Sequence, residues 1–298
     1  MILVTGAAGM TGSHLLDVYR EDELYRTDLS ESPGIHRLDI RIPDQVIQIV
    51  RRLQPSLVIH LAAETDVDRC EREPDHAFQT NYVGTLNVTL ACQRYGVDLV
   101  YVSTAGVFNG HQDEPFTEFD TPAPVNMYAR SKLEGEKIVQ TLHARHYIMR
   151  AGWLFGGRER DKKFVGKIAS LCLNGNRDGE ILAVDDKFGS PTYARDFLQT
   201  VKLLSGTGYY GLYHAVNHGV GSRYDVAVEI ARILQVGTRI VRTSSDAFVL
   251  PAPRPRSEFA RNYKLELLGM DQLQHWRDAL RDYLVSWAVP SKTVAIVR

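Results

Sequence analysis

A glycine-rich loop directly after the first apolar run constrains the fold of this chain more than any other feature. Residues 2–4 are typical of a buried strand, and the loop that follows has glycines at positions 6, 9 and 12. Glycines at this spacing let the backbone turn sharply, approach a pyrophosphate and pack a helix closely on the strand. The N-terminus of that helix presents free N–H groups and the positive end of its dipole to phosphate. The loop, formed by Gly6, Gly9, Met10, Thr11 and Gly12, therefore predicts a dinucleotide-binding strand–loop–helix unit.

The rest of the N-terminal half alternates short apolar runs with helical patterns. Further strands are predicted at 23–28, 38–40, 57–62, 98–102 and 146–150. Helices are predicted after the glycine loop, with Leu15, Leu16 and Tyr19 on one face, and then from Pro43, at 74–94 and at 128–142. Such repetition implies an α/β fold, a Rossmann-like doubly wound parallel sheet with right-handed crossovers.

The C-terminal half is less regular. A helix is predicted at 193–204, and a strand at 211–216 that rejoins the first sheet. Ser222 and Asp225 have the spacing of a reciprocal helix cap, whereas the prolines of segment 251–256 exclude regular structure there. We therefore expect a dinucleotide-binding domain over 1–152, to which 191–219 return. Residues 153–190 and 220–298 would form a smaller substrate-binding lobe at the carboxyl edge of the sheet, where ligands of open α/β sheets bind.

Composition narrows the class of protein. The formal net charge is −1, so no overall positive field favours nucleic acid or an anionic membrane surface. No run approaches the ~18 apolar residues that span a bilayer, and the strand predicted at the very start leaves no room for a signal peptide. Three cysteines without a C-x-x-C pair suggest neither a disulfide framework nor a zinc site. We expect a cytoplasmic protein with no nucleic-acid or membrane partner; whether it forms a homodimer stays open.

The carboxylate of Asp28 bears on the choice of cofactor. Asp28 ends the second predicted strand, where it can accept hydrogen bonds from the adenosine ribose and would repel a 2′-phosphate. Arg26 and Arg37 are close in sequence and would weaken that repulsion. The cofactor is therefore predicted as NADPH or NADH. A polar cluster after the strand 57–62 lacks the spacing of a metal site, and we interpret it as a loop that lines the cofactor; no metal is predicted.

Three residues have the chemistry of a proton donor and its partners. Tyr128 and Lys132 are four apart on one predicted helix, so their side chains lie on one face. An ammonium favours the phenolate and would bring the tyrosine pKa, normally about 10, toward neutral pH. Thr104 lies at the carboxyl end of strand 98–102, so its hydroxyl can bind the same substrate oxygen. These residues indicate acid–base chemistry at a carbonyl.

These motifs carry a family resemblance. TGAAGMTG, VSTAGVF and YARSK resemble the extended short-chain dehydrogenase/reductases, and HLAAETDVDRCEREPDHAFQTN, RAGWLFGG, DDKFGSPTYARDF and APRPRSEFARNYKLELLG resemble dTDP-4-dehydrorhamnose reductase. The resemblance implies hydride transfer from a nicotinamide to C4 of a nucleotide-activated 4-keto-6-deoxy sugar. It assigns the proton to Tyr128, its tuning to Lys132 and hydroxyl assistance to Thr104. It implies cofactor contacts at Met10, Thr11, Asp28, Asp39, Ile40, Ala62, Ala63, Glu64 and Thr65.

The substrate side is less defined by sequence. The resemblance places Trp153 against the sugar, although a buried core indole is the alternative. Arg254 or Arg256 could bind the nucleotide diphosphate, or be solvated loop residues. Thr104 and Ala105 would face the substrate.

One departure leaves other functions open. The family continues with Asp-Tyr where this chain has Ala105 and Gly106, which puts the identity of the sugar in doubt and argues against dehydration. A nucleotide-sugar epimerase on the same scaffold is one alternative. The other is a non-catalytic regulatory subunit resembling the β subunit of methionine adenosyltransferase.

Overall fold

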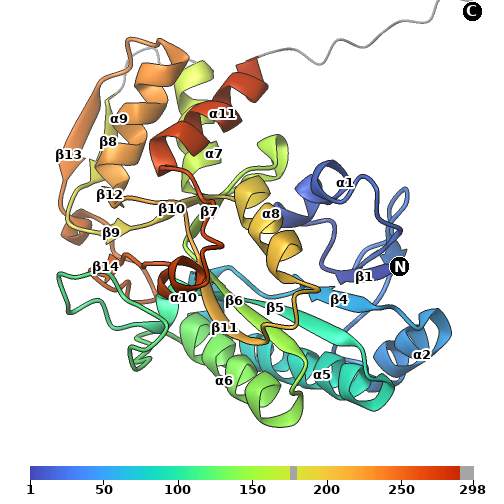
Figure 1. Cartoon of the computed structure of the whole chain (residues 1–298). Coiled ribbons are helices and arrows are strands. Elements are labelled where there is room, and N and C mark those ends of the chain that lie inside the picture. The colour runs from blue at the N-terminus through green and yellow to red at the C-terminus, as the bar shows by residue number, and fades with distance from the viewer. Residues whose placement is uncertain (175–179, 289–298) are drawn as a thin grey trace, which may run out of the picture.

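Seven parallel strands form the central sheet of the computed structural model, which describes residues 1–174 and 180–288 (Figure 1). Their order is β11-β6-β5-β4-β1-β2-β3. The chain runs outward from β1 to β3 and then crosses to β4 on the other side of β1, as in doubly wound dinucleotide-binding folds. The predicted fold class is confirmed, and the strand expected to return lies beside β6. The strands are β1 Ile2–Thr5, β2 Leu24–Asp28, β3 His36–Arg37, β4 Leu57–His60, β5 Asp98–Thr104, β6 His146–Ala151 and β11 Gly211–Ala215.

Helices cover both faces of this sheet, because successive residues of each strand point to opposite sides. Leu3 and Val58 pack against a layer of α2 (Pro43–Leu53), α5 (Gly84–Tyr95) and α6 (Met127–Leu142). Ile2 and Val4 face α1 (Leu15–Val18) and α8 (Ala194–Leu204). Strands buried on both faces explain the continuous apolar runs in the sequence.

A second set of elements begins where β6 ends, so it starts at the carboxyl edge of the sheet. Its helices α7 (Phe164–Leu173), α9 (Arg223–Leu234) and α11 (Trp276–Ala288) share an apolar core of their own and lie together in Figure 1. The predicted Ser222–Asp225 capping box starts α9, and 251–256 has no regular structure, as expected. The remaining strands are β7 Trp153–Phe155 with β10 Pro191–Tyr193, β8 Ile181–Val184 with β13 Ile240–Thr243, and β12 Gly221–Ser222, β9 Phe188–Gly189 and β14 Ser257–Glu258. Shorter helices are α3 Val67–Arg72, α4 Pro74–Phe78 and α10 Tyr263–Leu267.

Two local sequence predictions are wrong. The strand expected at 38–40 ends at Arg37, and Leu38 and Ile40 instead bury their side chains in the core that contains α2 and α5. Leu16 is 58% exposed, although Leu15 is buried as expected. The chain enters α1 through a 3₁₀ turn at Thr11–His14. Consecutive helical residues point about 100° apart, so Leu16 lies away from the face on which Leu15 and Tyr19 are buried.

The helix predicted at 74–94 is also interrupted. It consists of α4, a π-helical turn at Gln79–Val83, and α5. The inserted turn contains Asn81, which is fully buried and acts in the site described below. Wider turns of this kind occur often at functional sites.

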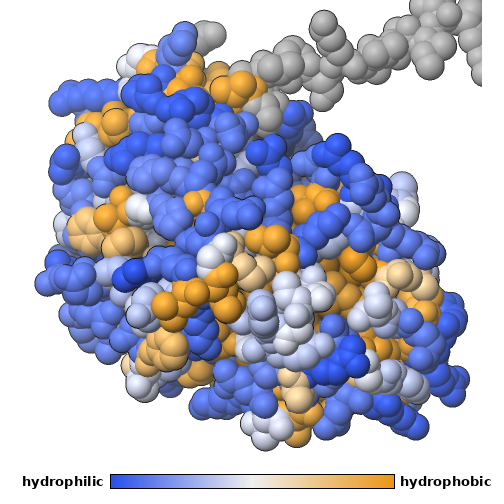
Figure 2. All heavy atoms as spheres, viewed as in Figure 1, coloured by the Kyte–Doolittle hydropathy of each residue, from blue (hydrophilic) through white to orange (hydrophobic). Residues whose placement is uncertain are grey.

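On the face shown in Figure 2, hydrophobic residues gather mainly over the half of the molecule that contains the sheet, and hydrophilic residues cover most of the other half. Within 1–174 and 180–288, no helix combines the length and the apolar character needed to cross a membrane.

Candidate active site

The glycine loop makes a tight turn between β1 and the first helix. Gly6 has a φ of +72°, and a Cβ at this position would lie 2.5 Å from the backbone nitrogen of Ala62. A Cβ on Gly12 would collide with the carbonyl of Ala7. Because only glycine fits at these two positions, the turn carries no side chain there and its backbone can be approached closely, which suits a pyrophosphate. Around the turn, Gly9 is exposed and Met10 and Thr11 are half-buried.

Two predicted cofactor carboxylates lie at the neighbouring strand ends. Asp28 ends β2, and its carboxylate accepts hydrogen bonds from the backbone N–H groups of Ala8 at 2.9 Å and Leu29 at 2.7 Å. This places Asp28 against the glycine loop, where a ribose would lie. Asp39 follows β3, and Arg41 donates to both of its carboxylate oxygens at 2.8 and 2.6 Å, which lowers the pKa of Asp39.

Asn81 fixes the loop after β4, which contains Ala62, Ala63, Glu64 and Thr65. Its amide oxygen accepts the backbone N–H of Glu64 at 2.8 Å, and its amide nitrogen donates to the Glu64 carbonyl at 3.0 Å. The same nitrogen donates to the Ser131 hydroxyl of α6 at 2.9 Å. The Glu64 carboxylate pairs instead with Arg69 and His76. Asn81 thus joins the predicted cofactor loop to the helix of Tyr128, a role that sequence reasoning missed; its only signal was an amide inside a helical pattern.

His60 lies beneath this loop as a neutral structural histidine. The Thr85 hydroxyl donates to the Asn81 carbonyl at 2.7 Å, so His60 Nε2–H donates to Thr85 Oγ at 3.2 Å and Nδ1 accepts the Thr5 hydroxyl at 2.7 Å. Burial, with a smaller contribution from the Lys132 charge, lowers the pKa of His60 to about 3. The imidazole therefore ties β1 and β4 to α5 without carrying a charge.

Tyr128 and Thr104 come together at the carboxyl end of β5. Asn126 caps α6 by accepting the N–H of Ala129 at 2.9 Å, so Tyr128 sits in the first turn of the helix. Burial raises the pKa of the Tyr128 phenol, and an interaction with the Thr104 hydroxyl opposes this rise. The Thr104 oxygen accepts the N–H of Gly106 at 3.0 Å, which fixes its position and leaves its proton for another acceptor.

Lys132 is buried one turn further along α6, with a side chain that is 3% exposed. Its ammonium lies 4.1 Å from the centre of the Tyr101 ring, and no carboxylate in the described ranges comes within ion-pair distance. Burial lowers the pKa of Lys132 to about 7, while Glu136 opposes this. The expectation that Lys132 brings the Tyr128 pKa down is therefore wrong for the protein alone, because burial raises that pKa and the opposing interaction comes from the Thr104 hydroxyl.

A buried ion pair supports the floor of the site. Arg150 of β6 donates to both carboxylate oxygens of Glu136 at 2.9 and 2.6 Å, and Ser103 donates to the same carboxylate at 2.6 Å. The side chains of Arg150 and Glu136 are 3% and 2% exposed. This pair fixes α6 against β5 and β6, and its Ser103 partner directly precedes Thr104 in the chain. It was not predicted from the sequence.

Trp153 lies in a polar setting on the side of the second set of elements. Its indole N–H donates to the Glu258 carboxylate, its ring packs on Gly189, and the Arg223 guanidinium lies 3.6 Å from the ring centre. The indole is half-buried, unlike the core residue that was the alternative interpretation. Neither Arg223 nor Glu258 was identified from sequence.

The two candidate diphosphate arginines differ in position. Arg254 is half-buried and pairs with Asp68 of α3 at 3.0 Å. Arg256 pairs at 3.0 Å with Asp113. The Asp113 side chain is 87% exposed, so this ion pair lies on the outer surface. The structure therefore favours Arg254. Ala105 is buried and offers no polar group.

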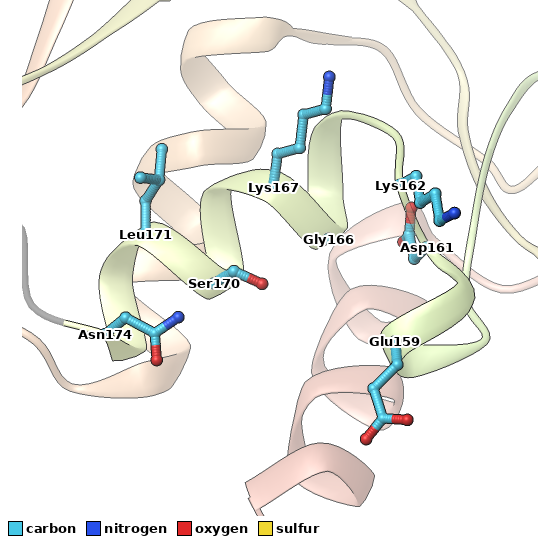
Figure 3. Close-up of a pocket in the computed structure, with 8 residues that line it drawn as sticks. All are labelled: Glu159, Asp161, Lys162, Gly166, Lys167, Ser170, Leu171 and Asn174. Carbon is cyan, nitrogen blue, oxygen red and sulfur yellow. The ribbon is translucent and has the colours of Figure 1, made fainter.

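A surface hollow of about 630 Å³ lies elsewhere, along α7 and the turn before it (Figure 3). Glu159, Lys167 and Ser170 are among its lining residues. It contains no member of the Tyr128, Lys132 and Thr104 group.

The chain is similar to known proteins in both sequence and structure. The sequence model of one family, the RmlD substrate binding domain, matches residues 1–288. The dTDP-4-dehydrorhamnose reductase of Mycobacterium tuberculosis is 34% identical over 304 residues, which span 100% of this chain and 95% of that protein. The crystal structure of the Clostridium acetobutylicum dTDP-4-dehydrorhamnose reductase superposes with a TM-score of 0.90 at 33% identity, covering 97% of this chain and 99% of that one. The Bacillus anthracis dTDP-4-dehydrorhamnose reductase in complex with NADP gives 0.88 at 33% identity, with 96% and 98% covered.

Proposed function

Since the chain belongs to the dTDP-4-dehydrorhamnose reductase family, we propose that it reduces the C4 keto group of a nucleotide-activated 4-keto-6-deoxy sugar with NADPH or NADH. The expected reaction converts dTDP-4-dehydro-L-rhamnose to dTDP-L-rhamnose. The observation that carries this proposal is the grouping of Tyr128 and Thr104 at the carboxyl end of β5, with Lys132 buried behind them. The epimerase and regulatory-subunit alternatives are not favoured, because relatives that match over nearly the whole chain are named reductases.

Reduction of a ketone needs a group that gives a proton to the oxygen. Tyr128 suits this role because its raised pKa keeps the phenol protonated at neutral pH. The Thr104 hydroxyl, whose oxygen already accepts the Gly106 N–H, would donate a second hydrogen bond to the same oxygen. Lys132 would hold ribose hydroxyls, which satisfy a buried ammonium that has no carboxylate partner among the described residues.

The cofactor fits the residues at the carboxyl edge. The turn at Gly6 and Gly12 has no side chain and suits the pyrophosphate. Asp28 lies against this turn, where it would bind a ribose hydroxyl. When bound, the reduced nicotinamide supplies the hydride. Trp153 would lie against the sugar, and Arg254 would bind the diphosphate. The cofactor contacts predicted at Met10, Thr11, Asp39, Ile40, Ala62, Ala63, Glu64 and Thr65 are part of this proposal.

Purified protein tests the proposal in a panel of nucleotide 4-keto sugars, assayed by loss of NAD(P)H absorbance. We expect stoichiometric oxidation of the cofactor with a dTDP-4-keto-6-deoxy sugar. Tyr128→Phe should lower turnover at least ~10²-fold, the scale for a positioned proton donor, with cofactor affinity kept within about twofold. Tyr209→Phe, at a side chain that is 54% exposed, is the matched control. Wild-type turnover in Tyr128→Phe would refute the role of the phenol.

From the sequence we also propose that the chain divides into a dinucleotide-binding domain, residues 1–152 with 191–219, and a substrate-binding lobe, residues 153–190 and 220–298. We further propose a cytoplasmic location and action without a nucleic-acid or membrane partner. Residues 175–179 and 289–298 of that lobe lie outside the described residues. The homodimer stays an open expectation, and size-exclusion chromatography with light scattering tests it.

A further inference from the structure

Glu258 is a charged residue beside the candidate active site that no part of the proposed chemistry uses. It lies on β14, in parallel register with Gly189 of β9. One carboxylate oxygen, Oε2, accepts the indole N–H of Trp153, whose ring packs on that same glycine. The carboxylate and the indole therefore form one fixed unit on the substrate side.

The other oxygen of Glu258 faces the loop of Thr104. A Cβ added at Gly106 would lie 2.8 Å from Glu258 Oε1. Residues 105 and 106 contribute no polar side chain, so this carboxylate is the polar group that the second set of elements brings to that part of the site. Within 1–174 and 180–288, Trp153 alone donates a hydrogen bond to the Glu258 carboxylate, which leaves the lone pairs of Oε1 for a ligand.

Arg223 and Tyr128 are among the charged or titratable groups that interact with the Glu258 carboxylate on the substrate side. The Arg223 guanidinium lies over the Trp153 ring, and the described chain provides it no carboxylate within ion-pair distance. Burial lowers the pKa of Arg223 to about 10, and the Glu258 charge opposes that change. The Glu258 charge also adds to the rise in the Tyr128 pKa. The carboxylate thus acts electrostatically on groups around the proposed sugar position.

We propose that Glu258 is a sugar-positioning residue: its Oε1 accepts a hydrogen bond from a ring hydroxyl of the sugar that lies against Trp153. This inference rests on the proposed function. The absent side chain at Gly106 leaves the space in which the carboxylate sits. A site built to accept a hydroxyl rejects an analogue that lacks it, because the acceptor is then left unpaired.

The first part of the test uses Glu258→Gln and Glu258→Ala. Because the carboxylate would contact substrate and not cofactor, KM for the dTDP-4-keto-6-deoxy sugar should rise roughly three- to tenfold in the glutamine variant and more than ~10-fold in the alanine variant. KM for NAD(P)H should stay within about twofold. Glu114→Gln, at an exposed glutamate, is the matched control. An unchanged sugar KM in both Glu258 variants would overturn the proposal.

Gly106→Ala gives an independent perturbation of the same carboxylate. The added methyl group meets the far end of a flexible side chain, so the protein can fold by displacing the Glu258 carboxylate. Alone, Gly106→Ala should raise the sugar KM about as much as Glu258→Gln. In the Glu258→Ala background it should add less than about twofold. A full additive effect would place its origin at the nearby Thr104 hydroxyl and would contradict the proposal.

Substrate analogues separate hydroxyl binding from a merely structural support of Trp153. Wild type and Glu258→Ala are compared on the 2-deoxy and 3-deoxy forms of the sugar nucleotide. With one of the two analogues, kcat/KM of wild type should fall at least ~10-fold below its value for the unmodified sugar nucleotide. The same replacement should lower kcat/KM of Glu258→Ala by less than about threefold. Equal losses in both proteins for both analogues would overturn the role of Glu258. If wild type turns over no keto sugar, the proposed function fails instead, and calorimetric binding of the same dTDP-sugars to both proteins still tests Glu258.

Discussion

Replacing Lys132 by methionine should stabilise the ligand-free protein while it destroys activity. Methionine has a similar length and no charge, so it removes the cost of burying an ammonium that has no carboxylate partner in the described chain. The pKa of Lys132 falls from 10.5 to about 7 on burial. Between these values the unfolded chain binds a proton that the folded protein does not, so the free energy of unfolding of wild type rises with pH across this window.

The magnitude follows from that difference. Each pH unit in the window corresponds to about 1.4 kcal/mol, so the Lys132 side chain lowers the free energy of unfolding by roughly 4 kcal/mol at pH 7 and about 2 kcal/mol at pH 9. Lys132→Met should gain these amounts relative to wild type, and the gain should vanish near pH 10.5.

Urea denaturation of both proteins at several pH values between 6 and 10, without nucleotides, measures this difference. Lys137→Met on the same helix is the control, because its side chain is 58% exposed and its ion pair with Glu134 is worth little. A Lys132→Met protein that is no more stable than wild type at pH 7, or whose advantage does not shrink with rising pH, would refute the argument from burial.

Two further predictions concern the support of the site. Arg150→Met should lower the free energy of unfolding by ~3–5 kcal/mol, because it leaves the Glu136 carboxylate buried and unpaired. Adding Glu136→Leu should restore much of that stability. Chemical denaturation measures both variants, and a loss below ~1 kcal/mol in Arg150→Met would contradict the pairing. Asn81→Asp removes the amide donor that holds the Glu64 carbonyl, so NAD(P)H should bind roughly tenfold more weakly in a fluorescence titration; an unchanged affinity would mean that the loop is held without it.

Features that depend on neighbours in sequence were predictable. The glycine loop, the Ser222 cap and the helix that begins at Pro43 are encoded within a few residues of one another, and the structure contains all three. The candidate catalytic residues Tyr128 and Lys132 share one helix face for the same reason. Errors arose where packing overrode the local pattern. Leu38 and Ile40 are as apolar as a strand requires, but they lie after the end of β3 and pack into the core beside α2 and α5.

The sequence by itself determined the parallel α/β architecture, the dinucleotide-binding turn and the placement of Tyr128 and Lys132 on one helix, because short-range spacing and backbone sterics encode them. The tertiary structure decided the electrostatics and the substrate side. The pKa values of Tyr128 and Lys132 depend on burial, which spacing does not measure. Glu258 meets Gly106 and Trp153 only because strands from distant parts of the chain come together at one edge of the sheet.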